Sequence, residues 1–181
     1  NYVNHVNGGF HIVANTKNPL SDPVMFYTNA RGVRWDTREG QTFVNEWYRH
    51  SFIQRDFKWL SGVAYDLDPV DSFRDYAMWW YKHMFTSGAC DAIYWDDVFL
   101  NANFNMVTTE AYRLPDGTIQ PSTGLFNMRE LIRRTAVLQT ELGRPARNMV
   151  HMTNTAIAPI CSFASMNYDW EDHNGFNDFQ N

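Results

Sequence analysis

Short apolar runs alternate along the chain with longer segments in which apolar residues recur every three or four positions. The runs predict strands over 24–28, 59–65, 91–95, 148–152 and 163–168. The spaced segments predict helices over 40–52, from an N-cap at Asp71 or Ser72 to Gly88, and over 124–142. A loop over 100–123, with a turn at 115–117, precedes the last of these helices. Repeated alternation of strand and helix is typical of a mostly parallel sheet with helices packed against it.

Two architectures have this order of elements, a doubly wound open sheet and a (β/α) barrel. No glycine-rich phosphate loop follows the first strand, which disfavours the nucleotide-binding form of the open sheet. Polar residues instead follow the C-terminal ends of several strands, where barrel enzymes build their active sites: Asn29, Asp66, Asp96, Asp97, His151, Asp169 and Glu171. We therefore predict an α/β fold of the TIM-barrel, (β/α)8 type.

The length of the chain is short for such a barrel. A complete barrel takes about 250 residues, whereas this sequence has 181 and supplies four or five predicted strands. We expect residues 1–181 to form a single segment, the later half of a barrel, within a longer chain.

Composition narrows the classes of function. The net charge of −5 and the lack of a Lys/Arg block argue against nucleic-acid binding. The sequence contains no run of about 18 apolar residues, so no membrane span is predicted. Cys90 and Cys161 do not have the spacing of a metal-binding or redox motif. The aromatic content of 16% fits either a ring-rich core or a carbohydrate cleft in which rings stack on sugar faces.

The strongest candidate chemistry lies at Tyr94-Trp95-Asp96-Asp97, where a predicted strand ends. Adjacent carboxylates repel each other unless a ligand, a metal or a proton relieves the repulsion. Alternation sends neighbouring side chains to opposite faces of a strand, so both acids reach one side only where the strand gives way to loop. The other interpretation is a helix-capping Asp beside a surface Asp.

Other candidates are single residues or local clusters. Residues 169–173 hold three acids and a histidine, which suit substrate positioning, a cation bound through oxygen ligands, or a solvated acidic loop. His151 ends a short apolar strand and is either a hydrogen-bonded core residue or part of the same rim. Asn29 with Arg31, and Tyr65 with Asp66, are placed to bind sugar hydroxyls or to cap turns.

Several of these segments resemble the catalytic barrel of glycoside hydrolase family 123 and its uncharacterised relatives. The similarity covers roughly residues 24–178 and rests on residues 91–103, 114–117, 126–134, 150–152 and 166–171. It implies a retaining exo-glycosidase that acts on N-acetylhexosamines by substrate assistance, with no organic cofactor and no metal ligand. It also implies a carbohydrate partner and a location outside the cytoplasm, secreted or periplasmic.

The resemblance gives Asp96 the role of orienting the substrate's 2-acetamido group as its oxygen attacks the anomeric carbon. Asp97 stands where the family has the Glu that protonates the leaving oxygen, and it is one methylene shorter. Glu171 is another candidate acid, and a two-carboxylate mechanism with Asp97 and Glu171 is the alternative. The implied sugar-stacking and binding residues are Tyr94, Trp95, Tyr168, Asp169 and Trp170.

Two other functions fit the same residues. Replacement of the acid by Asp suits a carbohydrate-binding or structural barrel without activity. A metal-dependent hydrolase would instead use Asp96, Asp97, His151 and Asp169, and would lose activity with a chelator.

Overall fold

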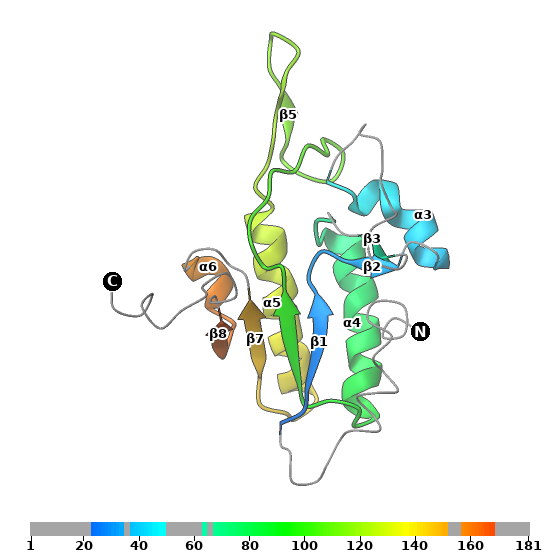
Figure 1. Cartoon of the computed structure of the whole chain (residues 1–181), viewed down its shortest axis with the longest axis vertical. Helices are drawn as coiled ribbons and strands as arrows, with labels where there is room; N and C mark the ends of the chain where they lie inside the picture. Colours follow the sequence, from blue (N-terminus) through cyan, green and yellow to red (C-terminus); the bar gives the residue numbers. More distant parts are fainter. Residues whose placement is uncertain (1–22, 35–36, 50–62, 65–66, 152–156, 169–181) are drawn as a thin grey trace, which may run out of the picture.

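A parallel sheet forms the centre of the structure (Figure 1). The computed structural model describes residues 23–34, 37–49, 63–64, 67–151 and 157–168. The sheet has four strands in the order β1-β4-β7-β8, with bounds Met25–Asn29, Ala92–Asp96, Asn148–His151 and Met166–Tyr168. The four strands lie in the sheet in the order in which they occur in the sequence, and the short strands between them in the chain belong to other sheets. The predicted strands over 24–28, 91–95, 148–152 and 163–168 are confirmed within a few residues.

Two long helices cover one face of this sheet. They are α4 (Asp71–Thr86) and α5 (Leu125–Glu141), which contact each other, and a short helix α6 (Ala158–Cys161) follows β7. The ring of Tyr81 on α4 packs edge-on against Trp95 at 5.3 Å between centroids, and its hydroxyl donates to Thr28 Oγ1 at 3.3 Å. None of the described helices is both long and apolar enough to cross a bilayer.

The helix ends follow the sequence signals in part. Gly88 and Gly143 have φ of 71° and 70° just beyond α4 and α5, as the glycine stop signals predict. The predicted N-cap at Asp71 or Ser72 is wrong, because Val70 occupies that position and makes no side-chain cap bond. Asp71 begins the helix instead and forms an ion pair with Arg74 one turn later.

A smaller layer contains α3 (Arg38–Trp47) and two short strands, β2 (Val33–Arg34) and β3 (Val63–Ala64). The helix predicted over 40–52 is confirmed over 40–47, and the described residues Tyr48 and Arg49 lie beyond its end. The strand predicted over 59–65 is described only at β3, which pairs antiparallel with β2. β3 is therefore not a strand of the parallel sheet. Its partner β2 follows β1 in the chain and belongs to a separate two-stranded sheet.

The segment predicted as a loop over 100–123 contains a hairpin of β5 (Tyr112–Arg113) and β6 (Ile119–Gln120). Figure 1 shows this hairpin projecting beyond the ends of the strands to which their arrows point. Its turn is the predicted one. The Asp116 carboxylate accepts bonds from Thr118 N–H at 2.9 Å and Thr118 Oγ1 at 2.6 Å, and these bonds lower the pKa of Asp116.

Candidate functional site

The face of the sheet opposite the two long helices carries polar and aromatic side chains. Side chains alternate along each strand, so residues two apart share a face. On the helix-covered face lie the buried side chains of Phe26, Thr28, Ile93, Trp95 and Val150. The other face, towards the C-terminal ends of the strands, presents Tyr27, Asn29, Tyr94, Asp96, His151 and Tyr168. We call this second set the polar face.

The adjacent acids Asp96 and Asp97 both turn towards the polar face. The hydroxyl of Tyr27 donates to Asp96 Oδ2, and Asn29 Nδ2 donates to Asp97 Oδ2. Tyr27 and Asn29 are two residues apart on β1 and share a face, so the two carboxylates must do so too. A regular strand forbids this arrangement for neighbouring residues.

The backbone at Asp97 makes this arrangement possible. Its φ is 55°, and it is the one non-glycine residue with positive φ in the described part of the chain. The left-handed conformation costs an L-residue about 1–2 kcal/mol, and Asp and Asn tolerate it better than most. It ends the strand and turns the Asp97 side chain back towards β1. The Asp97 N–H also donates to Asp96 Oδ1 at 2.9 Å, which stabilises the turn.

His151 connects Asp96 to a tyrosine. Its Nδ1 lies 3.2 Å from Asp96 Oδ1 and 2.5 Å from the Tyr94 hydroxyl, and the imidazole is buried. One ring nitrogen carries at most one proton. A protonated Nδ1 donates to Asp96 or to the Tyr94 oxygen, whereas an unprotonated Nδ1 accepts from the Tyr94 hydroxyl, so the tautomer decides which bonds form. The arrangement joins a carboxylate, an imidazole and a phenol in one hydrogen-bonded group.

Aromatic rings flank the acids on the polar face. Tyr27 and Tyr94 pack edge to face at 5.3 Å, and the His151 and Tyr168 rings lie 5.0 Å apart. Tyr27 is 42% exposed and Tyr168 is 48% exposed, so each offers ring surface to solvent. Tyr27 was absent from the predicted site. Alternation gives the signal that finds it, because it lies two residues before Asn29 on the same predicted strand.

Trp95 does not belong to this site. It was predicted to stack on the sugar, but it is 0% exposed and its ring packs against Tyr81 of α4. Strand alternation is the reason, because Trp95 lies between Tyr94 and Asp96 and must point to the opposite face. Its role is in the hydrophobic core.

Arg31 is also placed differently from the prediction. It was expected to bind sugar hydroxyls, but the residue is only 3% exposed. Its guanidinium donates from Nε to the Asp97 carbonyl at 3.2 Å, from Nη1 to the Leu67 carbonyl at 3.2 Å, and from Nη2 to the Phe99 carbonyl. Arg31 therefore contacts the backbone around the acids from within the protein.

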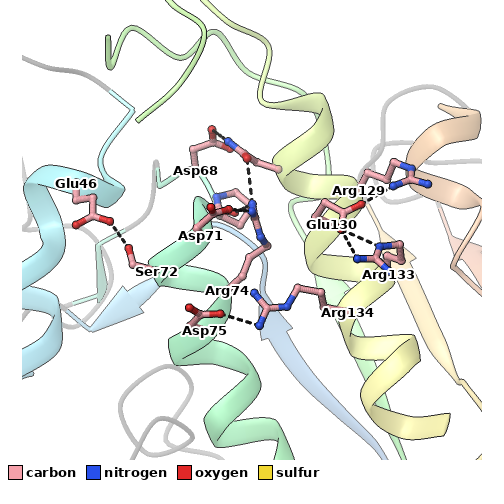
Figure 2. Close-up of polar contacts among 12 residues, drawn as sticks. Glu46, Asp68, Asp71, Ser72, Arg74, Asp75, Arg129, Glu130, Arg133 and Arg134 are labelled. Atoms are coloured by element: carbon pink, nitrogen blue, oxygen red, sulfur yellow. Dashed lines mark hydrogen bonds and ion pairs between the residues drawn. The ribbon is translucent and has the colours of Figure 1, made fainter. Parts of the chain in front are cut away.

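A buried carboxylate supports the loop that follows Asp97, and sequence reasoning did not single it out. Asp68 Oδ2 accepts from Asn103 Nδ2 at 2.7 Å and from Asn127 Nδ2 at 2.8 Å (Figure 2). Asp68 is 1% exposed, and burial raises its pKa, although its amide partners and the charges of Arg31 and Arg74 oppose the rise. The carboxylate joins the segment before α4, the loop after β4 and the first turn of α5.

Charged residues on the solvent side of α4 and α5 form pairs of a different kind. Glu130 accepts from Arg133 Nε at 2.7 Å and also pairs with Arg129, while Arg134 contacts Asp75 at 2.7 Å (Figure 2). The bond from Arg133 is the main cause of a lowered Glu130 pKa. These side chains are partly exposed, so the pairs contribute little to stability.

Five predicted site residues lie outside the described residues: Tyr65, Asp66, Asp169, Trp170 and Glu171. Of the others, Asn29, Tyr94, Asp96, Asp97, His151 and Tyr168 come together on the polar face. Within the described part of the chain, no group of three or more His, Cys, Asp or Glu side chains is arranged to hold a metal ion.

The sequence matches no family model, and it matches no curated protein.

Proposed function

We propose that the chain is part of a (β/α)-barrel glycoside hydrolase, and that Asp96 and Asp97 act on a carbohydrate at the polar face. The strand order β1-β4-β7-β8 supports the barrel, because the strands of this sheet lie side by side in the same order in which they occur in the sequence. A barrel has this monotonic order, whereas a doubly wound sheet reverses direction at a switch point. The polar face would then line the mouth of the barrel.

The observation that carries the proposed chemistry is the shared orientation of the two acids. Substrate assistance needs one carboxylate to hold the acetamido group and a second to reach the leaving oxygen on the same bound sugar. Asp96 and Asp97 bind Tyr27 and Asn29 on one face of β1, so a single ligand can contact both acids. Asp96 takes the acetamide role and Asp97 the proton-donating role, as in the family that the sequence resembles.

The surrounding rings suit a sugar. Tyr27 and Tyr168 are about half exposed, on the outer strands β1 and β8 of the sheet, with the acids between them at the end of β4. Flat rings with a polar edge bind the apolar faces of pyranose rings while their hydroxyls reach polar groups. The partly exposed Tyr94 adds a hydroxyl at the site, whereas Asn29 and His151 are 2% and 4% exposed and hold Asp97, Asp96 and Tyr94 from within the protein.

A binding protein of the same architecture is the second candidate. Its support is the Asn29–Asp97 bond, which holds the shortened carboxylate against β1. Proton transfer needs a heavy-atom separation of about 2.6–3.2 Å, and Asp is one methylene shorter than the Glu of the resembled family. In this case the site would bind glycan without cleaving it.

Hydrolysis of a panel of chromogenic glycosides tests the proposal, using the full chain with and without a chelator. We expect turnover of an N-acetylhexosaminide that the chelator does not change. Turnover restricted to sugars without an acetamide would replace substrate assistance by two ordinary carboxylates. Glycan binding without turnover would favour the binding protein, and loss of activity with chelator would favour a metal-dependent hydrolase.

A further inference from the structure

Arg31 holds the backbone at the residue assigned as the acid and just after it. Its Nε donates to the carbonyl of Asp97 at 3.2 Å, and its Nη2 donates to the carbonyl of Phe99, two residues further along. The guanidinium carbon lies 5.2 Å from the centroid of the Phe99 ring, over its face. Its Nη1 donates to the Leu67 carbonyl at 3.2 Å, which anchors the group to a separate segment.

The same residue also fixes the amide that binds the Asp97 side chain. The backbone N–H of Arg31 donates to Asn29 Oδ1 at 2.8 Å. Because the oxygen end of the amide accepts this bond, the nitrogen end must be the one that faces Asp97. Asn29 Nδ2 does donate to Asp97 Oδ2. The carboxylate and the carbonyl of Asp97 are thus both held by the Asn29–Arg31 segment.

We propose that Arg31 is the positioning residue of the acid pair, which keeps Asp97 in its left-handed conformation and its carboxylate on the same face as Asp96. The expected effect on catalysis rests on the proposed function, whereas the expected effect on the backbone at Asp97 rests on the contacts of Arg31 alone. The planar guanidinium presents several donors in fixed directions, so one side chain reaches three carbonyls. Lysine keeps the positive charge, but its single ammonium cannot reproduce that geometry.

A kinetic cycle tests the catalytic part in the full chain. We expect Arg31→Lys to lower kcat about 10- to 100-fold, as displacement of a catalytic group by about 1 Å does, with KM within about twofold of wild type. In an Asp97→Asn background the same change should lower kcat by less than about twofold, since its effect runs through Asp97. Equal losses in both backgrounds, or a rise in KM alone, would overturn the proposal.

Two further variants support this cycle. Arg113→Lys is the matched control, because Arg113 also donates to a backbone carbonyl, Gly117 O at 2.9 Å, but lies on the exposed hairpin. It should leave kcat unchanged. If Arg31→Lys does not fold, Phe99→Leu removes the ring under the guanidinium, and we expect kcat to fall about threefold or more at constant KM. An unchanged kcat in Phe99→Leu would contradict the positioning role.

A measurement of stability tests whether Arg31 holds the Asp97 backbone, and it needs no activity assay. In the full chain, Asp97→Gly should have an unfolding equilibrium constant about 5- to 30-fold smaller than Asp97→Ala, because glycine adopts positive φ without the alanine penalty. With Phe99→Leu or Arg31→Lys present, this ratio should shrink to about twofold or less, since the backbone is then released. A ratio that stays the same would overturn the positioning role even if no sugar is turned over. Absence of turnover with the expected ratios would refute only the proposed function.

Discussion

Replacement of Gly124 by alanine tests how firmly the buried Asp68 carboxylate is held against the start of α5. Gly124 is the N-cap of that helix and has φ of 64°. A Cβ at this position would lie 2.7 Å from Asp68 Oδ1 and 3.2 Å from both Asp68 Cγ and Oδ2. Alanine therefore meets two independent penalties, one from its own backbone conformation and one from the carboxylate.

The two penalties have different sizes. Positive φ costs alanine about 1–2 kcal/mol. The contact requires Asp68 to move, and Asp68 Oδ2 accepts bonds from the amides of Asn103 and Asn127 at 2.7 and 2.8 Å. Leaving one buried donor unsatisfied costs about 1–3 kcal/mol. Gly124→Ala should therefore lower the free energy of unfolding by about 2–5 kcal/mol.

Gly143 provides the matched control. Its φ of 70° is similar, but nothing lies within 4 Å of a Cβ built there. Gly143→Ala should cost only the conformational term, about 1–2 kcal/mol. Urea unfolding followed by tryptophan fluorescence measures both variants, and in an Asp68→Ala background the excess loss at Gly124 should disappear. Losses for the two glycines that agree within about 0.5 kcal/mol would refute the reasoning.

Other substitutions test the roles assigned to single side chains. Burial raises the pKa of Asp68, so the folded state holds the proton more tightly and stability falls as pH rises from the ordinary value of 3.8 through the raised pKa. Asp68→Asn, which can keep both amide bonds, should flatten that part of a urea-midpoint profile, and an unchanged slope would contradict the assignment. Trp95→Ala should cost about 3–5 kcal/mol as a core truncation, whereas Trp95→Phe should retain glycan affinity; a large loss of affinity in folded Trp95→Phe would restore Trp95 to the site. Glu130→Gln should change the free energy of unfolding by less than about 1 kcal/mol, and a loss of several kcal/mol would show that its pairs with Arg129 and Arg133 matter more than their exposure suggests.

Much of the parallel sheet could be predicted from local pattern. The run that forms β4 and the periodic segment that forms α5 carry strong signals, and Gly143 ends the helix as expected. The position of the acids at a strand end was also predictable. By contrast, β2 and β3 have two residues each. Such short strands carry no periodicity, so their antiparallel pairing was missed.

The details of the site depend on contacts between distant segments. The sequence allowed both acids to reach one side if the strand ended between them, but the positive φ of Asp97 that produces this arrangement is unusual for a non-glycine residue and could not be predicted. Arg31 was interpreted as a residue that binds sugar hydroxyls or caps a turn. Its burial depends on carbonyls of Leu67, Asp97 and Phe99, which lie 36 or more residues away in the chain. Trp95 is different, since alternation alone would have placed it on the face opposite Asp96.

Turnover by variants of the two acids tests the central claim most directly. The assay is hydrolysis of a chromogenic N-acetylhexosaminide by the full chain, compared with Asp96→Asn and Asp97→Asn. Asp116→Asn on the exposed hairpin is the matched control. If the pair performs the chemistry, each site variant should lose about 10²- to 10⁴-fold in kcat while it stays folded and the control keeps wild-type activity. Site variants that turn over the substrate as fast as the Asp116 control would contradict the account.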